Sequence, residues 1–132
     1  MEDPTAPYVL MVDDDELFSG IIEQRFKIEN VPFRRVATTH EALDLLQKEI
    51  KPELMLLDIQ LYGADGLSFL SDIRDMPPLK DLPVIVLSNF NQQEEVARSK
   101  ELGALRHVQK VSLEPAEVVA MVREALKGTA GN

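Results

Sequence analysis

The sequence contains no cysteine, and what it lacks narrows its function before any motif is considered. Without cysteine the chain can form no disulfide framework, no thiolate zinc site and no cysteine nucleophile, which is compatible with a cytoplasmic protein. Its longest apolar runs are about five residues, far below the roughly 20 that span a bilayer. The segment Met1–Pro7 has neither a basic start nor an apolar stretch, so it does not resemble a signal peptide.

Basic residues are also scarce, since 14 Lys and Arg stand against 23 Asp and Glu, a formal net charge of −9. Residues 1–24 hold seven acids and no Lys or Arg, and the block Asp13–Glu16 is their densest part. Nucleic-acid backbones and anionic membranes are both bound through Lys and Arg. We therefore expect no nucleic-acid partner and no membrane partner.

Short apolar runs indicate how the 132 residues are organised, and that length suits one domain. Tyr8–Val12, Leu54–Leu57 and Val84–Leu87 are apolar without alternation, which is typical of strands buried on both faces. Weaker strand candidates are Phe33–Ala37 and Leu105–Val108. Apolar residues at helical spacing lie between these runs. Strand and helix alternate five times, which predicts a three-layer, doubly wound α/β fold around a five-stranded parallel sheet.

Capping signals mark two of the helices. Thr38 with Glu41 is typical of a capping box. Asn91 with Glu94 indicates the start of the fourth helix, and Gly103 could end it.

No internal repeat or low-complexity segment divides the chain. We expect one domain over residues 7–127, short tails at 1–6 and 128–132, and no output domain after the fifth helix.

A polar residue follows each buried run at the point where the strand should end. Asp13 and Asp14 follow the first run, Asp58 the second and Ser88 the third, and Lys110 follows the last weak strand. Ligands of open parallel sheets bind beyond the carboxyl ends of the strands, so we expect these residues to converge. Each one alone suits a helix cap, a turn or a solvated charge. Their coincidence at four strand ends favours a site.

The residue types in this set indicate phosphoryl chemistry. Carboxylates packed together raise one another's pKa, and a hard cation such as Mg²⁺ removes that cost. Asp58 then has a plausible role as a carboxylate nucleophile that forms an aspartyl-phosphate. Lys110 would neutralise a second phosphoryl oxygen, and Ser88 could donate a hydrogen bond to a third.

In these residues the sequence resembles the response-regulator receiver domain, similar to the single-domain chemotaxis type. The spacings fit that family's pattern: 44 residues from Asp14 to Asp58, 30 from there to Ser88 and 22 more to Lys110. The matching segments are Val12–Glu16, Leu56–Gln60, Asp65-Gly66, Val84–Ser88, and Gly103-Ala104 ahead of Lys110.

The resemblance implies a sheet of order 2-1-3-4-5 and a role in phosphorelay signal transduction. Asp58 would accept a phosphoryl group from a histidine kinase or histidine phosphotransfer protein, and the chain would catalyse only its own phosphorylation and dephosphorylation. A switched face would then bind a downstream protein target, and the protein would be a monomer or weak dimer.

The same resemblance implies a role for each site residue. Ser88 would turn toward the phosphoryl group, and Lys110 would pair with it. Mg²⁺ would be held by the carboxylates of Asp13, Asp14 and Asp58 and by the backbone carbonyl of Gln60.

Several positions depart from the family's usual residues. Tyr62 and Val111 stand where proline is usual, so no cis-proline is expected in the last loop. Asn89 stands where a small residue is usual, and its size could narrow access for the phosphodonor. His107 stands where an aromatic switch residue is usual.

Two of these neighbours of the site allow more than one interpretation. His107 is either an edge histidine without a special role or a switch that makes the output pH-sensitive. Gln60 and Phe90 flank the path of the hydrolytic water in this family. Phe90 cannot hydrogen-bond a water, so we expect slow autodephosphorylation, although an exposed partner-contact role is as plausible.

Three other interpretations stay open. A haloacid-dehalogenase-like phosphatase also uses an Asp after a buried strand, but it needs a second acid where Gln60 stands. A flavodoxin-like cofactor binder needs a phosphate-cradling loop where Asp13–Asp15 would repel phosphate. A phosphorylation-independent, receiver-like interaction module would keep the fold, but the intact set of five residues argues against it.

Overall fold

A five-stranded parallel sheet forms the centre of the fold. The computed structural model describes residues 7–48, 51–89 and 92–130, and of residues 129 and 130 it describes the backbone alone. The strands of the sheet are β1 (Val9–Val12), β2 (Phe33–Val36), β3 (Leu54–Asp58), β6 (Val84–Ser88) and β7 (Arg106–Gln109). They pair in parallel in the order β2-β1-β3-β6-β7, which confirms the expected sheet. Two short strands after β3 form an antiparallel pair, β4 (Gln60–Leu61) and β5 (Ala64–Asp65).

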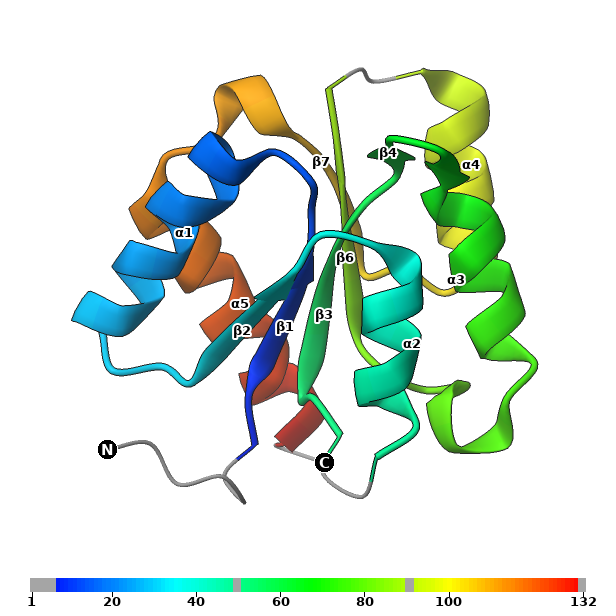
Figure 1. Ribbon diagram of the computed structural model, residues 1–132, viewed down its shortest axis with the longest axis horizontal. Coiled ribbons are helices and arrows are strands. Elements are labelled where there is room, and N and C mark those ends of the chain that lie inside the picture. The colour runs from blue at the N-terminus through cyan, green and yellow to red at the C-terminus, as the bar shows by residue number, and fades with distance from the viewer. Residues whose placement is uncertain (1–6, 49–50, 90–91, 131–132) are drawn as a thin grey trace.

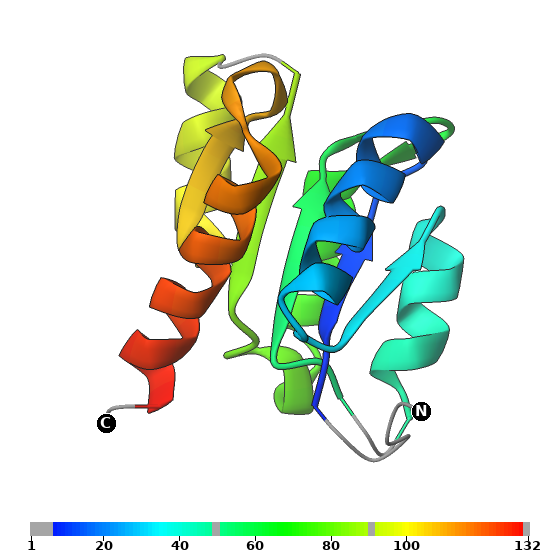
Figure 2. The ribbon, with the colours of Figure 1, turned by 90° about the vertical axis from the view of Figure 1, so that its left-hand side faces the viewer.

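Helices cover both faces of the sheet, as Figure 1 and Figure 2 show. One face carries α1 (Glu16–Ile28) and α5 (Pro115–Ala130). The other face carries α2 (Thr39–Leu46), α3 (Gly66–Arg74) and α4 (Gln93–Glu101). Two single 3₁₀ turns complete the chain, η1 (Pro77–Leu79) and η2 (Lys110–Ser112).

The apolar runs are buried on both faces because alternate side chains enter two separate cores. On β1, Leu10 and Val12 belong to the core under α2 and α3, whereas Val9 and Met11 belong to the core under α1 and α5. The same alternation continues along β3 and β6. A shift of one residue would exchange the two sets, so both cores fix the register of the strands.

The predicted helix caps are confirmed at the start of α2 and after the end of α4. The Glu41 N–H donates to Thr38 Oγ1 at 3.1 Å, as a capping box requires. Gly103 follows α4 with φ of 82°, a left-handed conformation that favours glycine. Asn91 lies outside the described residues, and Gln92 is the residue that precedes α4.

The strand boundaries differ by one residue from those expected. β1 begins at Val9 and β2 ends at Val36, whereas β3 and β6 also include the polar residues Asp58 and Ser88. β7 is Arg106–Gln109, shifted by one residue, because no uninterrupted apolar run marks its ends. The α5 helix continues to Ala130, past the limit expected at residue 127.

Candidate functional site

The strand register brings the predicted residues to one edge of the sheet, the upper end in Figure 1. β1 and β3 are aligned at Val12 and Leu57, so the residues that follow them are neighbours. Asp58 in turn pairs with Leu87, and Ser88 pairs with Gln109. The residues that meet at this edge are therefore Asp13, Asp14, Asp58, Ser88 and Lys110.

Three carboxylates form the centre of the site. Asp13, Asp14 and Asp58 each offer an oxygen, and these atoms lie within 4.8 Å of one another. Oδ1 of Asp13 accepts from the Asp15 N–H at 2.8 Å, and Oδ1 of Asp58 accepts from the Gln60 N–H at 2.9 Å. Both side chains are buried, so the backbone fixes each carboxylate and leaves its Oδ2 toward the pocket.

Lys110 bridges two of these carboxylates. Its Nζ lies 2.8 Å from Asp13 Oδ2 and 3.2 Å from Asp58 Oδ2, and 4.7 Å above the ring of Phe18. Burial works to lower the pKa of Lys110, but the two carboxylates outweigh it and raise that pKa. The ammonium is therefore held charged at the phosphoacceptor candidate.

The cluster retains an excess of negative charge. Burial raises the pKa of Asp13, and the Asp58 carboxylate adds to that rise, while Lys110 and the Asp15 N–H partly oppose it. Asp13 Oδ2 is buried, and the Lys110 ammonium at 2.8 Å is its partner. Three carboxylates against one ammonium leave two negative charges unbalanced in the cluster.

This donor set fits a hard divalent cation. Mg²⁺ binds oxygen at about 2.0–2.1 Å, which places its ligand oxygens roughly 3–4 Å apart, close to the spread of the cluster. Its two positive charges match the unbalanced carboxylates. The participation of the Gln60 carbonyl stays a prediction.

Asp14 ties the loop after β3 to the end of β1. Its Oδ2 accepts from the backbone N–H of Tyr62 at 2.6 Å. The Tyr62 side chain is 96% exposed, so the contact uses its backbone and leaves the phenol to solvent. From the sequence, Tyr62 is notable only because it stands where the family usually has proline. The residue type does not predict this backbone contact.

Gly66 packs directly against the phosphoacceptor strand. A Cβ at this position would lie 2.5 Å from Ile59 Cα and 2.6 Å from Asp58 O, distances that no side chain tolerates. The Gly66 N–H also donates to Ile59 O at 3.2 Å. Glycine is therefore required here by the close approach of two backbones.

Beside Ser88, two glutamines contact the backbone of Asn89. Asn89 N–H donates to Gln60 Oε1 at 2.7 Å, and Gln109 Nε2 donates to Asn89 O at 3.2 Å. Ser88 itself is fully buried at the end of β6. Gln109 is not among the residues expected from the sequence, where its place just before Lys110 is the only signal.

His107 is half-buried on β7, and its Nδ1 lies 3.2 Å from Ser99 Oγ on α4. The Ser99 hydroxyl donates to Val96 O at 2.8 Å. Since that hydroxyl has a single proton, it accepts from the His107 Nδ1–H. Phe90, the other modulating candidate, lies outside the described residues.

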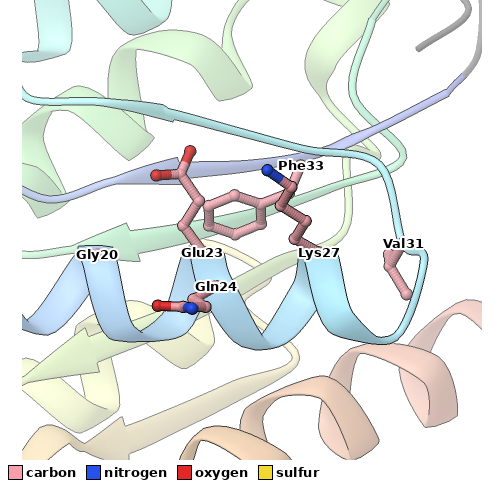
Figure 3. Close-up of a pocket in the computed structure, with 6 residues that line it drawn as sticks. All are labelled: Gly20, Glu23, Gln24, Lys27, Val31 and Phe33. Carbon is pink, nitrogen blue, oxygen red and sulfur yellow. The ribbon is translucent and has the colours of Figure 1, made fainter. Parts of the chain in front are cut away.

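A second cavity lies between α1 and β2, with a volume of about 510 Å³ (Figure 3). Glu23 and Lys27 extend from α1 on either side of the Phe33 ring in that view. None of its lining residues belongs to the strand-end set: Gly20, Glu23, Gln24, Lys27, Val31 and Phe33. It is therefore separate from the acidic site.

Comparison with known proteins agrees with this class of fold and site. The family model of the response regulator receiver domain matches residues 9–123. The sporulation initiation phosphotransferase F of Bacillus subtilis (strain 168) is 31% identical over 102 residues, 77% of this chain and 80% of that protein. The chain spans about half the length of other curated relatives that it matches.

Solved structures give the same picture. A CheY-like receiver domain protein from Methanospirillum hungatei JF-1 has a TM-score of 0.84 over 95% of this chain and 97% of its own, and at 23% identity it shows the fold alone. The Mn²⁺-bound form of the response regulator Rcp1 has a TM-score of 0.75 and 26% identity, over 92% of this chain and 93% of its own.

A doubly wound sheet with an acidic, lysine-bridged pocket at its carboxyl edge defines a phosphoacceptor class of domain. The chain belongs to the response regulator receiver family of two-component systems. This membership removes the haloacid-dehalogenase-like and flavodoxin-like interpretations. Within the described part of the chain, no helix is long and apolar enough to cross a bilayer.

Proposed function

We propose that the chain is a Mg²⁺-dependent phosphoacceptor in a phosphorelay, with Asp58 as the acceptor. The observation that carries this is the buried Asp58 carboxylate, paired with Lys110 at 3.2 Å and packed beside two further carboxylates. A carboxylate oxygen of Asp58 would attack the phosphorus of a phosphohistidine. The P–N bond then breaks, the new P–O bond forms, and the released imidazole takes up a proton.

The chain's own residues would support this transfer by position and charge. Asp13, Asp14, Asp58 and the Gln60 carbonyl would hold Mg²⁺, which supplies a Lewis acid for the phosphoryl oxygens. Lys110 would neutralise a further oxygen, and Ser88 would hydrogen-bond another after turning toward it. The acyl phosphate adds roughly −1.5 to −2 charges, which supplies the signal for a downstream protein target.

The phosphodonor would dock on exposed apolar side chains around the pocket. Leu17 and Ile21 are 77% and 50% exposed on one face of α1, one turn apart, and Val111 beside Lys110 is 77% exposed. Such clusters are typical of protein contacts. We propose a histidine kinase or phosphotransfer protein as the donor, and a cytoplasmic monomer or weak dimer as the acceptor.

The test is incubation with acetyl phosphate or phosphoramidate and Mg²⁺, followed by intact-mass measurement. We expect addition of one phosphoryl group to the wild type, none to Asp58→Asn, and none to the wild type when EDTA replaces Mg²⁺. An unmodified wild type would favour the phosphorylation-independent interaction module. Equal addition to Asp58→Asn would contradict Asp58 as the acceptor.

A further inference from the structure

The side chains of Gln60 and Gln109 both hydrogen-bond to the backbone of Asn89. Asn89 has no role in the proposed phosphoryl transfer. Gln60 Oε1 accepts the Asn89 N–H at 2.7 Å, and Gln109 Nε2 donates to Asn89 O at 3.2 Å. We call this arrangement the amide latch, made of the Gln60 and Gln109 side chains and the Asn89 backbone. The first distance is at the short end for N–H···O hydrogen bonds.

The latch ties together the three strand ends that carry the phosphoryl chemistry. Gln60 lies two residues after Asp58, and its own N–H donates to Asp58 Oδ1 at 2.9 Å. Asn89 directly follows Ser88 on the segment between β6 and α4. Gln109 pairs with Ser88 in the sheet and directly precedes Lys110. A displacement of Asn89 therefore requires the Gln60 or Gln109 side chain to follow it or to lose its bond.

We infer that the amide latch holds the Asn89 backbone in the position seen without a phosphoryl group, and that Gln60 and Gln109 are positioning residues for the switch at Ser88. This inference rests on the proposed function. If Ser88 turns toward a phosphoryl group on Asp58, the adjoining Asn89 is displaced. The latch bonds oppose that displacement, so they lower the population of the Ser88 and Asn89 conformation that completes the phosphoryl site.

The two glutamines have opposite roles, since Gln60 accepts a hydrogen bond and Gln109 donates one. Substitution by Glu at the two positions therefore has different expected effects. At position 60 the latch needs an acceptor, so Gln60→Glu keeps the bond and Gln60→Met removes it. At position 109 the latch needs a donor, so Gln109→Glu and Gln109→Met both remove it. Both Glu variants add one negative charge near the pocket. A difference between them therefore reports the hydrogen bond rather than the charge.

The measurement is the affinity of Mg²⁺-loaded protein for beryllium fluoride, an acyl-phosphate mimic, by calorimetry. We expect Gln60→Met and Gln109→Met to bind it about two- to tenfold more tightly than the wild type, toward the low end because water reaches both bonds. Gln109→Glu should bind more tightly than Gln60→Glu. The matched control is Gln93→Met on the exposed start of α4, which should bind like the wild type.

Equal affinities for the wild type and both Met variants would overturn the latch, as would equal affinities for the two Glu variants. A second readout needs no phosphate. Amide hydrogen exchange at Asn89 should be faster in Gln60→Met than in the wild type, and unchanged exchange would also overturn the latch. If no variant binds beryllium fluoride and the exchange difference persists, the proposed function fails and the latch geometry stands.

Discussion

The two sides of the phosphoacceptor pocket are built differently. On the acidic side, every residue of β1 and β3 is buried, and Asp13 and Asp58 are held by backbone N–H groups. On the switch side, which we define as Asn89 and residues 92–109, no residue of β7 is buried, and α4 buries only Ser99. The carboxylates are thus fixed at buried strands, while the elements that the proposed switch would displace have few apolar contacts to oppose it.

The largest expected effect comes from a glycine on the acidic side. Gly66→Ala should lower the free energy of unfolding by about 3 kcal/mol or more, because the new methyl group overlaps the backbone at Asp58 and Ile59. On the switch side, Gly103→Ala should cost only about 1–2 kcal/mol, for its left-handed φ of 82°. Urea unfolding measures both.

The matched control for these glycines is Gly20→Ala on α1. A Cβ there meets nothing within 4 Å, so the gain in helix propensity should stabilise the protein by about 0.5–1 kcal/mol. If Gly66→Ala behaved like Gly20→Ala, the close packing against Asp58 would be wrong.

The next effect has the opposite sign. Asp13→Asn should raise the metal-free free energy of unfolding at neutral pH by about 1 kcal/mol, because it removes a buried carboxylate from a cluster with an excess of negative charge. Burial raises the Asp13 pKa above 3.8, so the folded state binds this proton more tightly than the unfolded state. Wild-type stability should therefore fall as pH rises from about 4 through the folded pKa, and Asp13→Asn should remove that fall.

Thermal unfolding with and without Mg²⁺ checks this second expectation. If Mg²⁺ binds the folded state as proposed, it should raise the wild-type Tm more than that of Asp13→Asn. Asp44→Asn on the exposed face of α2 is the control, and it should leave both the pH dependence and the Mg²⁺ response unchanged. A metal-free Asp13→Asn that is less stable than the wild type would show that the Lys110 pair outweighs the burial cost.

The acidic side could largely be predicted from the sequence, whereas the contacts of the switch side could not. The fold and the convergence at Asp58 followed from uninterrupted apolar runs, since a strand buried on both faces fixes where its polar end lies. The latch could not be predicted, because the bond from Asn89 to Gln60 joins loops 29 residues apart and no periodicity describes it. The contact between the Tyr62 N–H and Asp14 could not be predicted either. Almost every residue type has a backbone N–H, so the residue type at position 62 does not indicate this bond.

The smallest expected effect concerns His107 on the switch side. Its Nδ1–H is used by Ser99, and its Nε2 is buried with no hydrogen bond in the described part of the structure. Protonation would give Nε2 a proton to donate.

We therefore expect the α4 amide signals of the beryllium-fluoride state to differ between about pH 5.5 and about pH 8 in the wild type, on either side of the range where histidine usually changes charge. His107→Tyr should keep the switch without this pH dependence, and His107→Ala should weaken the switch itself. NMR spectra of the three proteins at both pH values measure this. If His107→Tyr and His107→Ala gave identical changes, the histidine would be an edge residue only, and the switch side would depend on Ser88 and the amide latch alone.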